Sequence, residues 1–309
     1  MRVVFMGTPE FSVPCLRRLI ADGHEVVGVF TQPDKPKGRG KQMTPPPVKV
    51  TATENGIPVF QPRSMRDGEA LAILEQLKPD VIVVTAFGKI LPKEILDCPP
   101  YGCINIHASL LPRYRGAAPI QWCVLNGETE SGVTSMQMDV GLDTGDMLLK
   151  AKTPITPDMT AGELHDRLSV LGAEVLSETL SAAQMGELHP KKQDDALSNY
   201  APMLTKELSP IDFTKSAQAV HNQIRGLSPW PAATMVLCGK KLKIHASALC
   251  GDKGGMPGEV MENVKRLVIA CGDGKCVEIL TVQAEGKRAM SAAEYLRGSA
   301  VEKGSIATA

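Results

Sequence analysis

Short apolar runs alternate with helical patterns through the first half of the chain. Six runs have the length and composition of β-strands: residues 2–6, 25–30, 57–60, 80–85, 103–107 and 132–138. Between them, apolar residues recur at helical spacing in stretches such as 14–21 and 68–77. This alternation predicts an α/β fold, with a Rossmann-like, mostly parallel sheet that helices cover on both faces.

The longest helical pattern runs from about residue 161 to residue 185. Its apolar stripe consists of Leu164, Leu168, Leu171, Val175 and Leu176. Thr160 and Glu163 have the spacing of a capping box at its start. We expect this helix to close a first domain over residues 1–187.

The periodicity disappears after this helix. The polar stretch GELHPKKQDDALSNYAPMLTK, residues 186–206, contains two prolines, and we interpret residues 188–205 as an interdomain linker. Beyond it, a helical stretch at 216–225 precedes short alternating strands that glycine turns separate. The pattern predicts a second domain over residues 206–309, a small, largely antiparallel, OB-like β-barrel.

Composition limits the class of protein. The chain has 309 residues, of which 43% are hydrophobic and 22% charged, as in ordinary globular proteins. No apolar run approaches the ~18 residues of a membrane span. The opening MRVVFMGTPEF suits a first strand better than a signal peptide, so we expect a cytoplasmic protein without membrane association. Wide amphipathic surfaces are absent, which favours a monomer.

Several common site types lack their motifs. The eight cysteines form no C-x-x-C pair, so neither a disulfide framework nor a zinc ribbon is indicated, and we expect no metal. The first strand ends in GTPEF without a G-x-G-x-x-G, which disfavours a nicotinamide or flavin enzyme. Neither a P-loop nor an H-E-x-x-H motif occurs.

The run CINIHASLLPRYRGAAPIQW, residues 103–122, opens as a strand and carries the first candidate chemistry. It places Asn105 and His107 two positions apart, just before a loop with Arg113, Arg115 and Gly116. Residues two apart project from the same face of a strand, so an amide and an imidazole meet at its end. Ligands of parallel sheets bind beyond the carboxyl ends of the strands, where His107 lies.

A second candidate is MQMDVGLDTGDM, residues 136–147, where three aspartates surround two glycines. We interpret Asp139 and Asp146 as turn residues. The spacing of oxygen ligands does not match an EF-hand calcium loop. Asp143 lies in a glycine-flanked loop after the next strand, which could bring its carboxylate to His107.

An amide, an imidazole and a carboxylate suit direct acyl transfer to an external amine. Ser109 is the nearest hydroxyl, but no G-x-S-x-G elbow surrounds it, so no protein nucleophile is assigned. In such a reaction, donors stabilise the oxyanion, while a carboxylate orients the imidazole and helps to move the proton of the amine.

Residues 31–50 combine positive charge with residues that break helices and strands. The basic residues, which face only Asp34, are Lys35, Lys37, Arg39, Lys41 and Lys49. Prolines and glycines among them predict a loop without regular structure near the mouth of the site. The net charge of the chain is zero, but residues 206–309 hold 14 basic and 10 acidic residues, which modestly supports phosphate contact.

Two long motifs carry a family resemblance. NIHASLLPRYRGAAPI and the later MDVGLDTGD resemble the folate-dependent formyltransferase family, whose members use 10-formyltetrahydrofolate. FMGTPEFSVPCL resembles the family's opening strand and helix, and residues 30–49 resemble the basic insertion loop that grips a tRNA acceptor end. The barrel, with SPWP at 228–231, resembles an appended tRNA-binding domain. The resemblance spans nearly the whole chain.

The resemblance implies a reaction and residue roles. It is strongest to the members that transfer the formyl group to the α-amino group of methionyl initiator tRNA, for translation initiation. Asn105, His107 and Asp143 match the catalytic triplet. The implied folate-contacting loop is Ser109, Leu110, Leu111 and Pro112, the implied pteridine pocket is Phe87, Gly88, Ile90 and Leu91, and the implied tRNA contacts are Lys35, Lys37, Arg39 and Lys41.

Three alternatives stay open at this point. A related formyltransferase could act on a small amine, such as glycinamide ribonucleotide or an aminosugar nucleotide, and the same scaffold could hydrolyse formyltetrahydrofolate. The small-amine formyltransferase would need neither the basic loop nor the second domain as a tRNA platform. A non-catalytic RNA-binding protein would use both, but it would leave the Asn, His and Asp arrangement unexplained.

Overall fold

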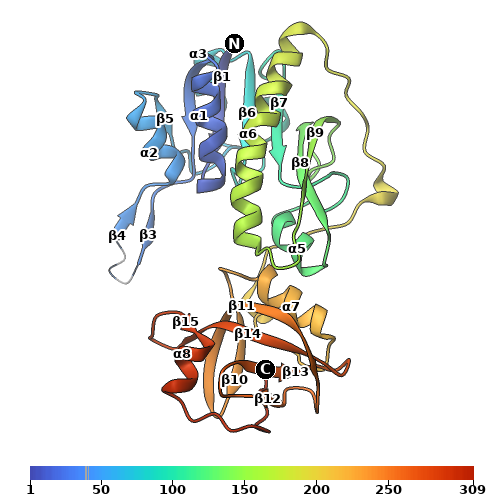
Figure 1. Cartoon of the computed structure of the whole chain (residues 1–309). Coiled ribbons are helices and arrows are strands. Elements are labelled where there is room, and N and C mark those ends of the chain that lie inside the picture. The colour runs from blue at the N-terminus through green and yellow to red at the C-terminus, as the bar shows by residue number, and fades with distance from the viewer. Residues whose placement is uncertain (39, 41) are drawn as a thin grey trace. The chain divides into compact units, whose positions relative to one another are not determined.

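A computed structural model describes residues 1–38, 40 and 42–309 of the chain. The chain divides into two compact units (Figure 1). Unit 1 contains residues 1–116, 131–153 and 165–201, and unit 2 contains residues 117–130, 154–164 and 202–309. Among the described residues, no helix is both long and apolar enough to cross a membrane.

Unit 1 is built on a seven-stranded sheet of order β5-β2-β1-β6-β7-β8-β9. The strands are β1 (Arg2–Gly7), β2 (Glu25–Phe30), β5 (Val59–Phe60), β6 (Val81–Thr85), β7 (Cys103–His107), β8 (Glu130–Gln137) and β9 (Met147–Pro154). The first five pair in parallel, and β8 runs antiparallel to β7. The predicted mostly parallel sheet is confirmed.

Helices cover both faces of this sheet, as the sequence predicts. Val4, Met6 and Ile82 pack on one face with Leu74 of α3 (Glu69–Leu77) and Ile95 of α4 (Lys93–Leu96). On the other face lie α1 (Val13–Ala21) and α6 (Ala161–Met185) (Figure 1). There, a Cβ on Gly172 of α6 would lie 3.1 Å from Ile106 of β7 and 3.9 Å from Cys15 of α1. Both layers therefore press on the strands that end at the candidate site.

The start of α6 is the capping box that the sequence predicts. The Thr160 N–H donates to the Glu163 carboxylate at 2.8 Å, and the Glu163 N–H donates to Thr160 Oγ1 at 3.2 Å. Two N–H groups at the start of the helix thereby find partners before its long apolar stripe begins.

The basic stretch corrects one prediction. Residues expected to be irregular form a hairpin of β3 (Lys35–Lys37) and β4 (Gln42–Thr44), with Pro36 opposite Met43. A proline is tolerated in a two-stranded ribbon where its nitrogen faces outward and no ladder bond is lost. The prolines that follow do not break structure either, because Pro47 occupies the first turn of α2 (Pro47–Glu54), where a free N–H is not needed.

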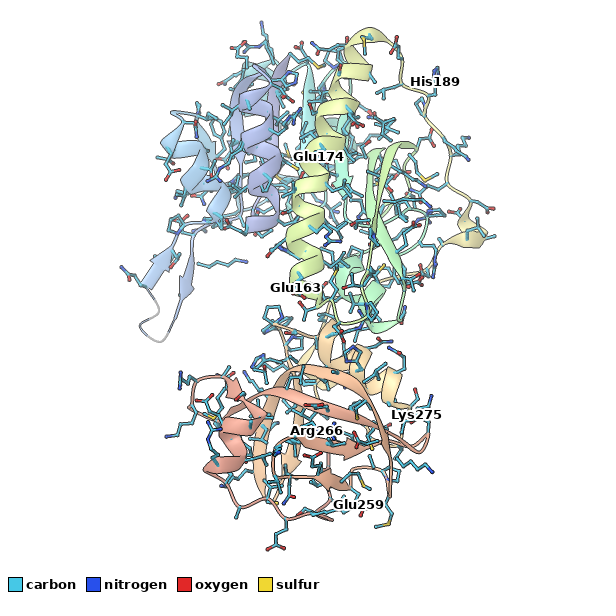
Figure 2. The ribbon with its side chains drawn as sticks, viewed as in Figure 1. Glu163, Glu174, His189, Glu259, Arg266 and Lys275 are labelled. Carbon is cyan, nitrogen blue, oxygen red and sulfur yellow. The ribbon has the colours of Figure 1, made fainter. Side chains whose placement is uncertain are left out.

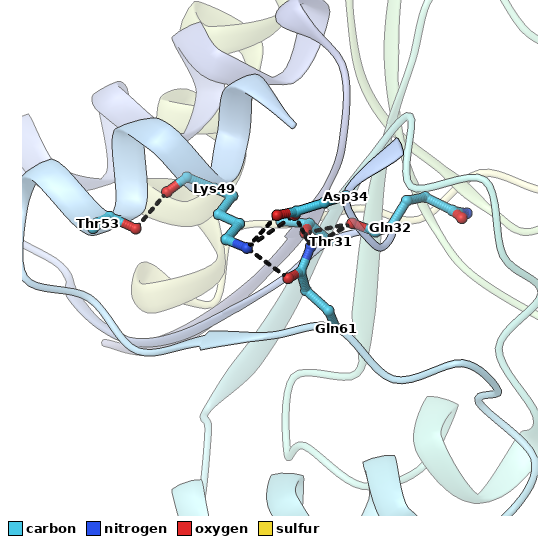
Figure 3. Close-up of polar contacts among 6 residues, drawn as sticks. All are labelled: Thr31, Gln32, Asp34, Lys49, Thr53 and Gln61. Atoms are coloured by element: carbon cyan, nitrogen blue, oxygen red, sulfur yellow. Dashed lines mark hydrogen bonds and ion pairs between the residues drawn. The ribbon is translucent and has the colours of Figure 1, made fainter. Parts of the chain in front are cut away.

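A polar cluster fixes the base of this hairpin (Figure 3). Lys49 Nζ lies 2.9 Å from the Asp34 carboxylate and 2.9 Å from Gln61 Oε1, and Gln61 Nε2 donates to Asp34 at 2.9 Å. The hydrogen bond from Lys49, followed by that from Gln61, lowers the pKa of the Asp34 carboxyl group. Lys49 is therefore committed to the cluster, and it is not among the four residues that the family resemblance implies as tRNA contacts.

Unit 2 contains a six-stranded antiparallel sheet, as predicted for residues 206–309. Its order is β10 (Ala233–Leu237), β11 (Lys240–Lys253), β14 (Lys275–Ala284), β13 (Leu267–Ala270) and β12 (Val260–Glu262), and β15 (Met290–Ser291) pairs with β14. Residues 304–308 join the two ends of this order, because Thr308 bridges to Val236 of β10 and the Val260 N–H of β12 donates to Ser305. Three helices complete the unit: α5 (Pro119–Leu125), α7 (Ala217–Gly226) and α8 (Ala292–Arg297).

Arg266, which is labelled in Figure 2, is the centre of an ion-pair network in unit 2. Its guanidinium lies 2.6 Å from Glu262, 3.1 Å from Asp252 and 3.5 Å from Glu278. Arg266 is therefore committed to contacts within the fold, and because its partners are acidic residues of the same segment, the excess of four basic residues in 206–309 is unchanged.

Candidate active site

The site begins at the carboxyl end of β7. Ile106 packs beneath α6, so Asn105 and His107, one position to either side, project from the opposite face of the strand. His107 is buried, with 6% of its surface exposed, while Asn105 is half-buried. Among the described residues, no hydrogen bond occupies the Asn105 carboxamide.

The His107 imidazole is held on both sides. Its Nε2 lies 2.9 Å from the Tyr114 carbonyl oxygen, and its Nδ1 lies 3.7 Å from Asp143 Oδ2. Because a carbonyl can only accept, Nε2 carries a hydrogen. In the neutral ring Nδ1 is then an unprotonated acceptor, and only the imidazolium has an N–H directed at Asp143.

Asp143 comes from the loop between β8 and β9. Its backbone has a φ of 54°, a left-handed conformation that few residues other than glycine adopt. Its Oδ2 accepts a hydrogen bond of 2.8 Å from the Gly116 N–H, so the loop that follows β7 holds the carboxylate. The three side chains that the sequence grouped thus come from two segments, and the contact between His107 and Asp143 is direct.

The loop after β7, residues 109–112, is tied down by its neighbours. Thr134 Oγ1 of β8 donates to the Ser109 carbonyl at 2.7 Å and accepts from the Leu111 N–H at 3.1 Å. Lys150 of β9 donates to the Leu111 carbonyl, while the Leu111 side chain packs with Met136 and Met147. Leu111 is therefore occupied within the protein, and Pro112 and Leu110 are its half-buried neighbours.

Burial lowers the pKa of the Lys150 ammonium, and Lys191 and Lys152 act in the same direction. The Lys150 side chain still donates its hydrogen bond to the Leu111 carbonyl. Its place in the structure is to support the loop.

The end of β6 carries the four residues expected in a pteridine pocket. Phe87 and Leu91 are buried in the sheet core, so their side chains support the turn, while Ile90 is 68% exposed. Gly88 has a φ of 75°. Gln32 Nε2 donates to the carbonyls of Phe87 at 3.2 Å and Gly88 at 3.1 Å, and thereby ties the end of β2 to this turn.

Two of the expected tRNA contacts, Lys35 and Lys37, belong to β3 of the hairpin. Lys35 is exposed on β3 and pairs with Thr44 across the ribbon, and Lys37 pairs with Gln42 through the backbone. Arg39 and Lys41 lie outside the described residues. A cavity of about 510 Å³ opens beside the hairpin, and its lining includes Lys35, Thr8, Gln32 and Arg17.

Sequence reasoning missed Tyr114, Thr134 and Gln193, which all touch the candidate catalytic segments. Tyr114 contacts His107, Thr134 contacts residues 109–111, and Gln193 contacts the Asp143 loop. No motif marks them, because each acts through hydrogen bonds with backbone or ring atoms of another segment. In the register of β7 and β8, Thr134 lies opposite His107.

Comparison with known proteins settles the family. The family model described as "Formyl transferase" matches residues 1–180, and "Formyl transferase, C-terminal domain" matches residues 203–300. The chain belongs to the formyl transferase family. This confirms the family and the class of enzyme that the sequence motifs indicate.

Within the formyl transferases, similar proteins carry one name. The chain is 55% identical over 307 residues to the methionyl-tRNA formyltransferase of Geotalea uraniireducens, covering 99% of this chain and 97% of that protein. It is 49% identical over 307 residues to the methionyl-tRNA formyltransferase of Alkaliphilus oremlandii, covering 99% of each.

Solved structures of formyl transferases share the fold. The N-formyltransferase of Helicobacter canadensis, in complex with folinic acid and dTDP-3-aminofucose, matches with a TM-score of 0.71 and 21% identity. The match covers 92% of this chain and 99% of that one. At this identity the likeness establishes the fold alone.

Proposed function

We propose that the protein transfers the formyl group of 10-formyltetrahydrofolate to the α-amino group of methionine on initiator tRNA. Relatives with 49% to 55% identity over nearly the whole chain are named for this activity. The observation that carries the assignment to residues is the contact of 3.7 Å between His107 Nδ1 and the Asp143 carboxylate at the end of β7. The catalytic part of the proposal covers residues 1–187, and residues 206–309 form the tRNA-binding part after a linker over 188–205.

Asp143 is the proposed proton acceptor. A free α-amino group has a pKa of roughly 7.7 to 8.0, so near neutral pH much of it is protonated and cannot attack. The Gly116 N–H holds Oδ2 of Asp143 at 2.8 Å, and the other carboxylate oxygen is left to receive the proton, directly or through a water.

Asn105 and His107 are the proposed donors to the formyl oxygen, on which negative charge develops. The Asn105 amide can donate without any change of charge. His107 already uses Nε2 on Tyr114, so it can donate only through Nδ1 and only as the imidazolium. The Asp143 carboxylate lies 3.7 Å from that Nδ1.

The atoms of the transfer balance without a covalent enzyme intermediate. The amine nitrogen bonds to the formyl carbon, the bond between that carbon and N10 of the folate breaks, one proton leaves the amine and one reaches N10. The folate supplies an activated formyl group. The protein supplies position, hydrogen bonds and the path of the proton.

Features at the ends of β6 and β7 fit a folate donor. The turn of Phe87 and Gly88 has a left-handed glycine, at which a Cβ would lie 3.3 Å from Gln32 Nε2, and beside it Ile90 presents an exposed apolar side chain. A flat pteridine needs such a combination of close backbone and apolar surface. Residues 109–112 are proposed as the second wall, and no metal is part of the proposal.

The proposed contacts with tRNA are Lys35 and Lys37 of β3, together with Arg39 and Lys41 of the same basic stretch of the sequence. The excess of four basic residues in 206–309 supports phosphate contacts by the second part. With tRNA as its substrate, the protein is expected to act in the cytoplasm. A monomer is expected from the absence of wide amphipathic surfaces in the sequence.

A transfer assay tests the function. The purified full chain is incubated with 10-formyltetrahydrofolate labelled in the formyl group, together with methionyl initiator tRNA, glycinamide ribonucleotide, an aminosugar nucleotide or no acceptor. We expect label to reach only the charged tRNA. Equal or faster transfer to a small amine, or release of labelled formate without an acceptor, would establish the corresponding alternative instead.

A further inference from the structure

The segment expected to be a simple linker lies against the candidate site. Residues 191–201, called the strap below, follow α6 and belong to unit 1. At one end the strap pairs with the start of β9, through two hydrogen bonds of 2.8 and 2.9 Å between Lys191 and Met147. At the other end the Arg115 N–H donates to the Asn199 carbonyl at 3.0 Å, and the Ala201 N–H donates to the Arg115 carbonyl at 2.7 Å. The strap therefore touches both segments that carry the proposed catalytic residues.

Gln193 joins the two segments through its side chain. Its Nε2 donates to the carbonyls of Asp143 and Gly145, each at 2.8 Å, and its Oε1 accepts from Arg115 Nε at 3.0 Å. Two carbonyls can only accept and a guanidinium can only donate, so this amide has one consistent orientation. The Arg115 guanidinium also forms an ion pair, because its Nη2 lies 2.8 Å from Asp195 Oδ1.

The strap also supports the imidazole. Asn199 Oδ1 accepts a 2.6 Å hydrogen bond from the Tyr114 N–H, and the Tyr114 carbonyl in turn accepts from His107 Nε2. Tyr114 and Asp143 have φ values of 60° and 54°, so neither backbone is in a favoured conformation. Such conformations persist where surrounding contacts determine them, and here the strap makes those contacts.

Close packing also holds Gly116, whose N–H donates to the Asp143 carboxylate. A Cβ on Gly116 would lie 2.5 Å from the Tyr200 ring and 2.8 Å from the Ala201 carbonyl oxygen. The strap therefore presses on the residue whose N–H holds the Asp143 carboxylate. Of the apolar side chains of the strap, Ala201 is fully buried, while Leu197 and Tyr200 are 64% and 61% exposed.

We propose that Gln193 is a positioning residue, which holds the Asp143 carboxylate at its distance from the His107 imidazole and makes the strap the third segment of the active site. The proposal rests on the proposed function for its effect on rate. Its effect on the loop is independent of any substrate.

The test uses the full chain with Gln193→Ala and Gln193→Glu. Glutamate keeps the acceptor for Arg115 but turns a carboxylate towards two carbonyls, so it isolates the two hydrogen bonds to the Asp143 loop. Leu197→Ala is the matched control, since it changes an exposed side chain of the same strap. We expect both Gln193 variants to lower the single-turnover formyl transfer rate at saturation by roughly tenfold to a hundredfold, as misplaced catalytic groups do. The half-saturating concentrations of tRNA and folate should stay within about twofold.

Hydrogen exchange gives the readout that does not need activity. Amides of residues 139–146 should exchange more than about tenfold faster in the Gln193 variants, while those of β1 and β6 stay unchanged. Should Gln193→Ala fail to fold, Gln193→Glu carries the test, because it keeps the side-chain size.

Three results would overturn the proposal: a wild-type rate in a folded variant, an equal loss in Leu197→Ala, or unchanged exchange in residues 139–146. If the wild-type protein transfers no formyl group to tRNA, the proposed function fails instead. The exchange measurement then still decides whether Gln193 holds the loop.

Discussion

The hydrogen bond from His107 Nε2 to the Tyr114 carbonyl determines which chemistry the imidazole can perform. It leaves Nδ1 as the one nitrogen available to a reacting group, at 3.7 Å from Asp143 Oδ2. Donation from Nδ1 requires the imidazolium, whereas proton acceptance requires the neutral ring. In the proposed reaction, Asp143 therefore lies beside the one imidazole nitrogen that can act and is itself the acceptor of the amine proton.

Asp143→Asn removes the negative charge of the side chain and keeps its shape. An asparagine oxygen can still accept from the Gly116 N–H, so we expect the folded loop to persist while the proton acceptor is lost. The single-turnover rate should fall by about 10² to 10⁴ near neutral pH. Asp139→Asn is the control in the same loop, because Asp139 makes turn contacts to Gly141 and Thr144 that asparagine can replace. Equal rates for Asp143→Asn and the wild type would remove Asp143 from the mechanism.

Asn105→Ala tests the donor that does not titrate. Losing one hydrogen bond to a developing oxyanion costs on the order of 10² to 10³ in turnover. We expect that loss in single-turnover formyl transfer, with the melting temperature little changed because the Asn105 side chain is half-buried. His107→Ala should be similarly slow. A wild-type rate in either folded variant would contradict its role.

Single site residues can be predicted from the sequence where their arrangement depends only on neighbouring residues. The two-residue spacing of Asn105 and His107 places them on one face of a strand in any sheet. Gln193 could not be predicted, because its partners lie 48 to 78 positions earlier in the chain and its hydrogen bonds to the Asp143 loop reach only backbone carbonyls.

The basic stretch of residues 35–41 is the segment whose charge should control tRNA affinity. Replacing Arg39 and Lys41 together by alanine should raise the tRNA concentration needed for half-saturation. It should also lower the slope of log affinity against log salt by roughly 0.7 to 0.9 for each phosphate that the protein no longer neutralises. Filter binding over a salt series measures this slope.

Arg66→Ala with Lys93→Ala is the charge-matched control, since both residues are exposed and lie outside the hairpin. An unaltered salt slope in the Arg39 and Lys41 variant, or an equal change in the control, would rule out these two residues as the anchor.

The contact between α5 and α7 has room for no additional methyl group. A Cβ on Gly226 would lie 2.8 Å from Leu125 Cγ and 3.0 Å from the Leu125 nitrogen. Gly226→Ala should therefore cost about 1–3 kcal/mol, because backbone must move to relieve the overlap. Thermal unfolding measures the loss. Gly298→Ala, where nothing lies within 4 Å, should leave stability nearly unchanged, and equal losses would argue against tight packing.

Elements with a clear apolar pattern were predictable, and two elements without one were not. The apolar stripe and the Thr160–Glu163 box specify α6, and both depend only on neighbouring residues. The hairpin of β3 and β4 was predicted wrongly, because a proline pattern does not reveal which way its nitrogens face. β9 was missed because its second half, KAKTP, carries two lysines and lacks the apolar residues by which the other strands were recognised.

For the whole molecule, His221 links stability to pH. It is buried, with Ser247 Oγ at 2.9 Å from Nδ1 and the Pro157 carbonyl at 3.0 Å from Nε2. Burial lowers its pKa below the ordinary 6.5, and Arg225 acts in the same direction, against the raising effects of the Pro157 carbonyl and Asp158. The unfolded chain then binds this proton more readily than the folded one.

Stability from His221 is thus complete above about pH 6.5 and decreases as the pH falls through the lowered pKa, by at most about 1.4 kcal/mol per pH unit. His221→Gln should flatten the dependence of unfolding free energy on pH in this range. The exposed His189, labelled in Figure 2, provides the control substitution to glutamine. A slope that His221→Gln leaves intact would assign the acid sensitivity to other groups.

The final residues of the chain have a consequence for anyone who shortens it. Residues 304–308 supply the hydrogen bonds between β10 and β12, so deletion from Gly304 onward would leave two strands with unsatisfied backbone groups. Exposed strand edges recruit other strands. Such a truncated protein is expected to self-associate and precipitate before it loses its secondary structure.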